Sequence, residues 1–168
     1  MIFLSSAYLT ELAVLAFAVL GKIRDPAAFA AAVAGYRILP ARIARAVVPL
    51  VVVAELASVL LLAAPITRLW GAALAIGLFA AFAVAMSSAL RRGLRVDCGC
   101  FSPGVADPIG PGSLTRTGLL LVLAVLALLG ARQSFRPADL LVATLMGVLI
   151  LVLSELVRLL AQPSGHLA

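Results

Sequence analysis

The sequence predicts an all-α fold, a polytopic transmembrane helix bundle of about five spans with one further amphipathic helix at the membrane interface. Hydrophobic residues make up 64% of the 168 residues and charged residues only 12%, and the mean hydropathy is +1.21. An ordinary globular domain is about 45–50% apolar and about 25% charged. So few polar groups cannot cover the surface of a soluble fold, whereas lipid tolerates an apolar surface.

Five apolar segments are the predicted spans. A helix needs about 20 mostly apolar residues to cross the hydrocarbon core, and backbone groups in lipid must be satisfied within the segment, which excludes open strands. The short connections at 65–68 and 132–139 predict antiparallel hairpins. We therefore expect a single transmembrane domain over residues 1–168. The predicted spans are residues 2–20, 47–64, 69–90, 114–131 and 140–160.

The N-terminal stretch and residues 22–45 are interpreted separately. The first apolar stretch has no basic leader and is followed by basic residues, which favours a retained transmembrane helix over a cleaved signal peptide. Residues 22–45 mix alanine and larger apolar residues with arginines. A membrane crossing here would bury Arg37, so we expect an amphipathic helix at the interface, broken near Pro40.

The distribution of the basic residues predicts membrane topology. The net charge is +6. The sequence has no basic stripe with interleaved aromatic residues, so nucleic-acid binding is not expected. An excess of Lys and Arg marks the cytoplasmic side. We therefore expect a multi-pass protein of the cell (inner) membrane, with the N-terminus outside and the loop 91–113 in the cytoplasm. The richer side has Lys22, Arg24, Arg37, Arg42, Arg45, Arg91, Arg92, Arg95, Arg116 and Arg158, and the other has Arg68, Arg132 and Arg136.

The loop at residues 91–113 contains the only two cysteines, Cys98 and Cys100, separated by a glycine. Two such thiols can close a small ring because glycine is conformationally permissive. Strain in the ring makes a disulfide more oxidising and more easily exchanged. The pattern therefore favours electron transfer over a structural crosslink, and a thiol–disulfide oxidoreductase is one possible activity.

Charged neighbours bear on thiol reactivity, because the thiolate is the reactive form. The loop begins with basic residues, which we expect to favour the thiolate, whereas the adjacent carboxylate acts in the opposite sense. The neighbours concerned are Arg91, Arg92, Arg95 and Asp97.

Two other interpretations of the cysteines stay open. In the first, they are ordinary buried residues of a structural subunit in a membrane complex. Two thiolates also suit a soft metal such as Cu(I) or Hg(II). Zinc is a poorer match, because it needs four ligands and the only histidine is His166. We assign no metal ligand.

Glu55 is the carboxylate of greatest interest within the predicted spans. It lies mid-helix, with no charged residue within nine positions on either side. An ionisable group at membrane depth is costly, so it is expected to be protonated or paired across the bundle. It could exchange protons during thiol chemistry or hold helices together by hydrogen bonding.

The segment VDCGCFSP resembles the MauE/DoxX-type redox-associated membrane proteins. The similarity runs from about residue 20 to 129 and includes LGKIRDPAAF, GYRILP, ALRRGLRVDCGCF and the helix entry at Gly112–Arg116. The CGCF element, which ends at Phe101, is its most specific part. Ser102 departs from the pattern, since the family commonly has glycine there.

The resemblance implies a thiol–disulfide role in the maturation of exported proteins, with a thioredoxin-like partner. By position, Cys98 and Cys100 would be the redox pair, while Lys22, Tyr36 and Glu55 match recurring positions of unassigned role. A single cysteine pair would need a second electron carrier, and a membrane quinone is a natural candidate. Exported substrates conflict with a cytoplasmic loop unless the loop is reached from the bundle interior or takes electrons from a cytosolic donor.

Overall fold

The computed structural model describes residues 2–94, 96–98, 109–130 and 137–160. Within these ranges the secondary-structure elements are all helices, which confirms the predicted all-α fold. Cys100, Arg95, Phe101 and Ser102 lie outside the described residues. The helices are α1 (Ile2–Arg24), α2 (Pro26–Gly35), α3 (Ala41–Ala63), α4 (Arg68–Arg91), α5 (Pro111–Gly130) and α6 (Pro137–Leu160).

Four of the described helices are long and apolar enough to cross a membrane. The qualifying segments are Ser6–Arg24, Arg42–Ala63, Arg68–Arg91 and Pro111–Gly130. The fifth predicted span corresponds to α6, whose described apolar stretch is Leu141–Ile150. These lengths and compositions define a multi-pass helical membrane protein.

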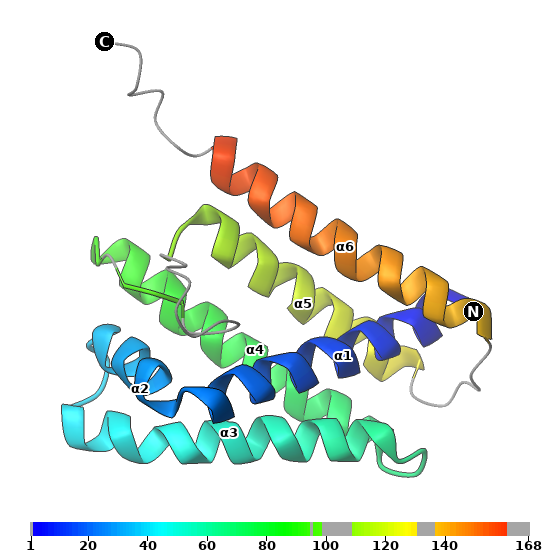
Figure 1. Ribbon diagram of the computed structural model, residues 1–168, viewed down its shortest axis with the longest axis horizontal. Helices are drawn as coiled ribbons and strands as arrows, with labels where there is room; N and C mark the ends of the chain where they lie inside the picture. The colour runs from blue at the N-terminus through cyan, green and yellow to red at the C-terminus, as the bar shows by residue number, and fades with distance from the viewer. Residues whose placement is uncertain (1, 95, 99–108, 131–136, 161–168) are drawn as a thin grey trace.

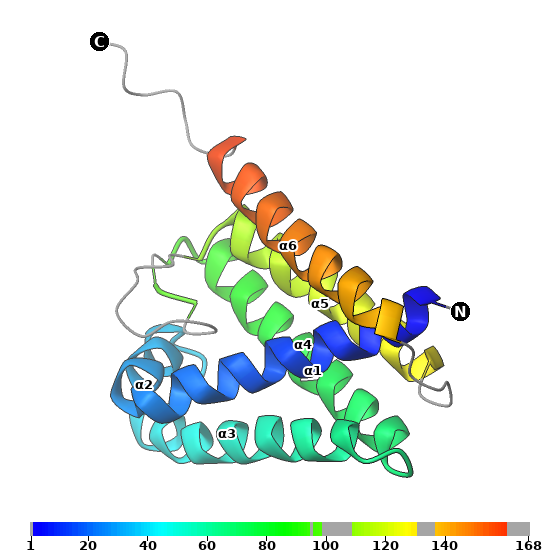
Figure 2. The same ribbon diagram turned by 45° about the vertical axis from the view of Figure 1, so that its right-hand side comes forward.

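Helix α1 lies at the centre of the bundle (Figures 1 and 2). It packs against α2, α3, α5 and α6, while α4 lies between α3 and α5. The main core consists of apolar side chains from α1, α3, α4, α5 and α6. Helix α2 packs mainly against α3 and also contacts α1, so it is an addition at one end of the bundle. Figure 1 shows it beside the start of α3.

The α3–α4 hairpin is held by a close helix contact at Gly71. A Cβ atom at this position would lie 2.6 Å from the Leu62 backbone nitrogen, so only glycine fits the approach. The Ser58 hydroxyl donates a hydrogen bond to the Gly71 carbonyl over 2.8 Å. A small residue combined with a side-chain hydrogen bond is a common way to join helices in lipid.

The segment predicted as one interfacial helix is divided among three elements. Lys22 belongs to the last turn of α1, α2 is only 10 residues long, and α3 begins at Ala41. Asp25 caps α2 by accepting a hydrogen bond from the Ala28 amide over 2.8 Å, which starts a new helix directly after α1. Arg37 is exposed, as expected, and its φ of 50° forms the turn towards α3.

The predicted loop at 91–113 is shorter than expected at its C-terminal end. Helix α5 begins at Pro111, because proline has no amide hydrogen to lose in the first helical turn and its φ suits a helix. At the other end, α4 stops before Gly93, which has a φ of 65°. The Leu94 amide donates back to the Ala89 carbonyl over 3.1 Å, so the helix ends on a glycine cap.

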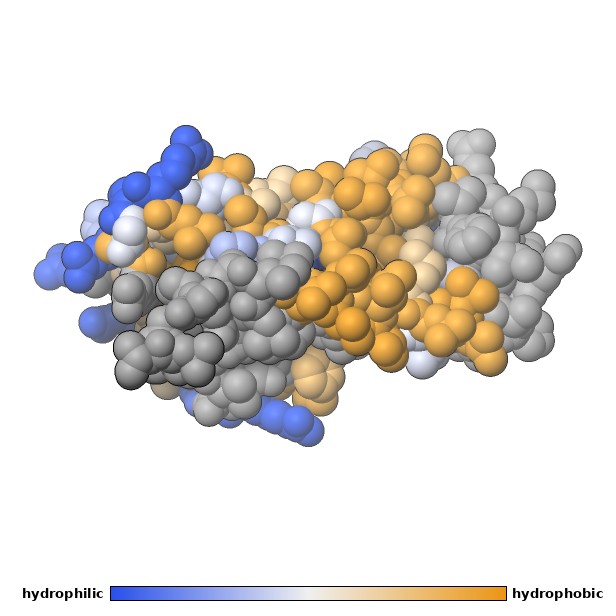
Figure 3. Space-filling view, turned by 90° about the horizontal axis from the view of Figure 1, so that it is seen from above, coloured by the Kyte–Doolittle hydropathy of each residue, from blue (hydrophilic) through white to orange (hydrophobic). Residues whose placement is uncertain are grey.

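Hydrophilic side chains gather at one end of the molecule, and the surface in the middle is apolar (Figure 3). The described arginines at the C-terminal ends of α1 and α4 and around α2 and the start of α3 are exposed. We call this region the basic end; it includes Arg24, Arg37, Arg42, Arg45, Arg91 and Arg92. An apolar band with charge at the end is the surface of a protein that sits in a bilayer.

Candidate functional site: Cys98 and the buried ion pair

Cys98 lies in a small apolar cluster at the basic end. The buried members of this cluster, which we call the Cys98 cluster, are Tyr36, Met86, Ala89, Cys98 and Ile109. They come from the end of α2, from α4 and from the chain on both sides of the segment at 99–108. Only 2% of the Cys98 surface is exposed. An ordinary core cysteine would be buried in the same way. Burial therefore does not distinguish a structural cysteine from a reactive one, and the contacts of the sulfur must do so.

Hydrogen bonds fix the backbone at Cys98. The Tyr36 hydroxyl donates to the Cys98 carbonyl over 3.0 Å, which joins the end of α2 to the loop. The Ile109 amide donates to the Val96 carbonyl over 2.8 Å. This backbone hydrogen bond closes the base of the loop, because it joins the residues just before Cys98 to those just before α5.

Among the described residues, Met86 and Arg116 bring different chemistry to the Cys98 sulfur. The Met86 sulfur lies 3.7 Å from it, and an Arg116 guanidinium nitrogen lies 3.9 Å from it. Arg116 comes from the second turn of α5 and is half-buried. A positive charge beside the sulfur stabilises a thiolate relative to a thiol, whereas burial among apolar groups acts in the opposite direction.

The two described arginines just before Cys98 in the sequence are Arg91 and Arg92. Arg92 donates to the backbone carbonyl of Arg37 over 3.0 Å and to that of Tyr36, so it ties the end of α4 to the end of α2. Asp97 is exposed and Arg91 is exposed. In the described part of the loop, the cation at the sulfur is therefore Arg116 and not Arg92.

A second polar site lies inside the bundle, where Lys22 of α1 meets Glu55 of α3. The Lys22 Nζ and a Glu55 carboxylate oxygen are 2.8 Å apart. The Lys22 ammonium also lies over the rings of Phe29 and Phe82, at 5.0 and 5.5 Å from their centroids. Glu55 was expected to be protonated or paired, and the structure pairs it with Lys22. Two of the three residues that match recurring family positions, Lys22 and Glu55, are thus partners.

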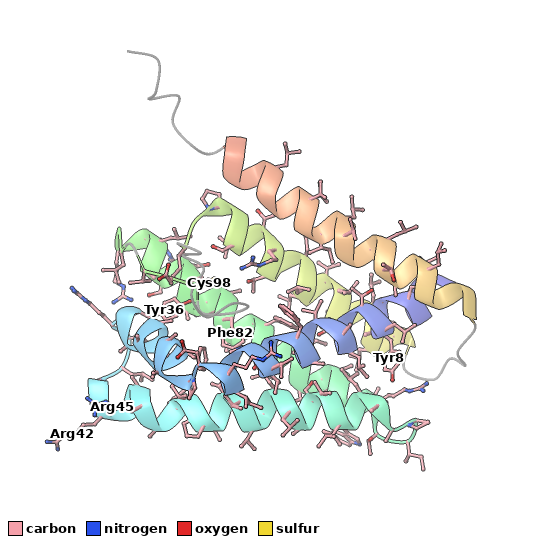
Figure 4. All side chains as sticks on the ribbon, viewed as in Figure 1. Tyr8, Tyr36, Arg42, Arg45, Phe82 and Cys98 are labelled. Atoms are coloured by element: carbon pink, nitrogen blue, oxygen red, sulfur yellow. The ribbon has the colours of Figure 1, made fainter. Side chains whose placement is uncertain are left out.

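An apolar cavity of about 520 Å³ lies between α2, α3 and α4. Cys98 and Tyr36 contribute to its wall, and so do Phe29 and Phe82, the rings that Lys22 contacts. Figure 4 shows Tyr36, Cys98 and Phe82 near one another, towards the end that carries Arg42 and Arg45. The cavity therefore shares two aromatic rings, Phe29 and Phe82, with the Lys22 site, and Cys98 lies in its wall.

The structure also shows features that sequence reasoning missed. Arg116 was counted only as a topology signal, although it lies in the segment Gly112–Arg116 that resembles the family. Met86 carried no signal of its own. Glu11 in α1 was given no special role, yet it is completely buried. No described residue forms a hydrogen bond with either of its carboxylate oxygens. In the described ranges, no three His, Cys, Asp or Glu side chains gather as a metal site.

A bundle of membrane-length helices with an ion pair in its interior and a buried cysteine at its basic end is a multi-pass membrane protein. The chain belongs to the MauE family: the family model described as methylamine utilisation protein MauE matches residues 1–130. The match covers α1 to α5 and stops before α6. The predicted resemblance to this family is thereby confirmed. No curated protein and no solved structure matches the chain.

Proposed function

We propose that this protein is a membrane thiol–disulfide redox protein that supports disulfide formation in other proteins through Cys98 and Cys100, together with a thioredoxin-like partner. The observation that carries the proposal is the Arg116 guanidinium 3.9 Å from the Cys98 sulfur. A core cysteine of purely structural value gains nothing from a nearby cation, whereas a thiolate does. Membership of the MauE family is consistent with a maturation role.

The burial of Cys98 suggests different roles for the two cysteines in thiol–disulfide exchange. With 2% exposure, the Cys98 sulfur cannot meet a sulfur of another protein. We therefore assign Cys100 the exchange with the partner and Cys98 the role of the internal thiol. A partner thiolate attacks Cys100 in the Cys98–Cys100 disulfide, the S–S bond breaks, and Cys98 leaves as a thiolate beside Arg116. The second partner thiol then attacks the mixed disulfide and releases Cys100.

Trapping of the mixed disulfide tests this assignment. The Cys98→Ser variant should accumulate a covalent adduct with an oxidised thioredoxin, because Cys100 attacks the partner disulfide and no internal thiol resolves the product. The matched variant Cys100→Ser should form no adduct, since its remaining thiol is buried. Adduct formation by Cys100→Ser alone, or full exchange in the double serine variant, would contradict the proposal.

Alkylation in intact and opened cells tests the location. We propose that the protein lies in the cell (inner) membrane with Cys100 accessible from the cytoplasm, as the charge distribution predicts. A membrane-impermeant maleimide should then label Cys100 only after the cells are opened. Labelling in intact cells would reverse the orientation and would place the pair on the side of the exported proteins.

A soft-metal site is the second candidate function, and the contact between Cys98 and Met86 favours it. Their sulfurs are 3.7 Å apart, and thiolate and thioether ligands select Cu(I). The positive charge of Arg116 beside the same thiol opposes cation binding. Stoichiometric Cu(I) binding that is lost in both Cys98→Ser and Met86→Leu, with no exchange of disulfides, would support this alternative over the redox function.

A further inference from the structure

We propose that the apolar cavity between α2, α3 and α4 binds a membrane quinone, which accepts the electrons of the reduced cysteine pair. The inference rests on the proposed redox function and names its electron acceptor and the acceptor's site. Its basis is the presence of the buried Cys98 in the wall of a cavity that is otherwise almost entirely apolar.

The size and lining of the cavity fit a lipophilic ligand with a flat ring. Small-molecule sites commonly measure about 300–1,000 Å³, and this one measures about 520 Å³. Apart from Tyr36 and Cys98, the residues that line it have only apolar side chains. Such a cavity has no counter-charge for an anionic ligand and few donors for a sugar or nucleotide. The volume is suitable for a quinone ring with the first part of its isoprenoid chain.

The edge of the cavity is open to the lipid-facing surface. Three of its lining residues, Ile38, Leu39 and Val84, are 49%, 38% and 69% exposed. An exposed apolar rim in a membrane protein faces acyl chains, so a ligand dissolved in the bilayer can enter without crossing water. A water-soluble oxidant would have to cross the same apolar rim, which makes it a poor reagent for Cys98.

Aromatic rings supply a surface on which a quinone can stack. Phe29, Tyr36 and Phe82 come from both sides of the cavity, and offset stacking on aromatic rings is favourable. The Tyr36 hydroxyl is 3.0 Å from the Cys98 carbonyl, so the only phenol in the lining lies beside the Cys98 backbone. A ring held there would be adjacent to Cys98, the residue whose thiol must give up electrons.

The electron balance requires an acceptor of this class. When the Cys98 and Cys100 thiols form a disulfide, two S–H bonds break, one S–S bond forms, and two electrons and two protons leave. A quinone takes both electrons and both protons at its two carbonyl oxygens and becomes a quinol. A phospholipid acyl chain would also fit an apolar cavity, but it accepts no electrons, and its presence is therefore an outcome that the experiment must distinguish.

Quinone binding to the purified full-length protein in lipid nanodiscs tests the site, with a ubiquinone that has one isoprenyl unit as the probe. Ala81→Phe places a ring in the cavity from an exposed position of α4. Ala73→Phe makes the same change at another exposed position of α4, outside the cavity. We expect saturable binding to the wild type, at least tenfold weaker binding to Ala81→Phe, and unchanged binding to Ala73→Phe.

A second matched pair guards against misfolding of the first. Val84→Trp blocks the rim from a side chain that is 69% exposed, and Val122→Trp on α5 is its control at 58% exposure. Thermal unfolding verifies that each variant is folded. Equal quinone affinity in the wild type and both cavity variants would overturn the proposal, as would a co-purified phospholipid that the quinone cannot displace.

The same protein separates this inference from the proposed function. Reduced wild-type protein should lose its two thiols when quinone is added without oxygen, and Ala81→Phe should do so at least tenfold more slowly while still exchanging with thioredoxin. Quinone binding without any thiol exchange would contradict the redox function alone. Thiol exchange without quinone binding would contradict the cavity assignment alone.

Discussion

The Lys22 ammonium and the Glu55 carboxylate are 2.8 Å apart, and both side chains are only 2% exposed. This contact joins α1 to α3 inside the bundle. It also places a cation behind the two aromatic rings, Phe29 and Phe82, that form part of the cavity wall. A pair so deeply buried is expected to be sensitive to the loss of one partner, because the other charge is left uncompensated.

Replacement of Lys22 by Met should destabilise the protein by about 3–5 kcal/mol, since it leaves the Glu55 carboxylate buried without its cation. The double variant Lys22→Met/Glu55→Leu should recover most of that loss, because neither charge remains. Thermal unfolding of the purified protein measures both effects, with Arg45→Met at an exposed position as the control. Additive losses in the double variant would show that the two residues are not coupled.

The Gly71 contact predicts a difference between two glycines of the same helix. Gly71→Ala should lower stability by about 1–3 kcal/mol through overpacking, because its Cβ would lie 2.6 Å from the Leu62 backbone nitrogen. Gly77→Ala should raise stability by up to about 1 kcal/mol, since nothing lies within 4 Å of its Cβ and alanine favours helix. Equal unfolding temperatures for the two variants would contradict the close α3–α4 contact.

The composition was sufficient to predict the helical membrane fold, because hydropathy reports which segments lipid can solvate. It also indicated that Glu55 needed a partner or a proton. The identity of that partner was beyond reach, since Lys22 is 33 residues away and was placed in an interfacial segment. A helix that starts anew at Asp25 leaves Lys22 in α1, and only the packing of α1 on α3 makes the pair.

The site at Cys98 shows a similar limit. Proximity in sequence favoured Arg91, Arg92 and Arg95 as the cations of the thiol. Of these, Arg95 lies outside the described residues, Arg91 is exposed, and the chain turns at Gly93 and directs Arg92 to the carbonyls at the end of α2. Arg116 reaches the sulfur from 18 residues away because α5 packs against α4. Sequence proximity was therefore a poor guide for Arg92, and it gave no indication of the charge that α5 brings to the sulfur.

Tyr36→Phe should make Cys98 easier to alkylate. The substitution removes the hydrogen bond from the hydroxyl to the Cys98 carbonyl but leaves the ring in the cluster, so the loop loses an anchor worth about 0.5–1.5 kcal/mol. In a Cys100→Ser background, the rate of reaction with iodoacetamide reports Cys98 alone, and we expect it to rise about 2- to 10-fold through more frequent opening of the loop. Tyr8→Phe, which removes a hydroxyl bonded to the Leu62 carbonyl at the other end of the bundle, should leave this rate unchanged.

Arg116→Met should have the opposite effect on the same thiol. It removes the guanidinium 3.9 Å from the Cys98 sulfur, and with less thiolate present at neutral pH the alkylation should slow, because only the thiolate reacts. Arg116→Lys should keep part of the rate, since it retains the charge without the planar fork. Arg45→Met removes an equal charge from an exposed position at the basic end, and it should leave the rate within twofold of the background. Equal alkylation rates in Arg116→Met, Arg116→Lys and Arg45→Met would mean that the charge of Arg116 does not affect the reactivity of the Cys98 thiol. The electrostatic argument for a reactive Cys98 would then fail, although the membrane fold would stand.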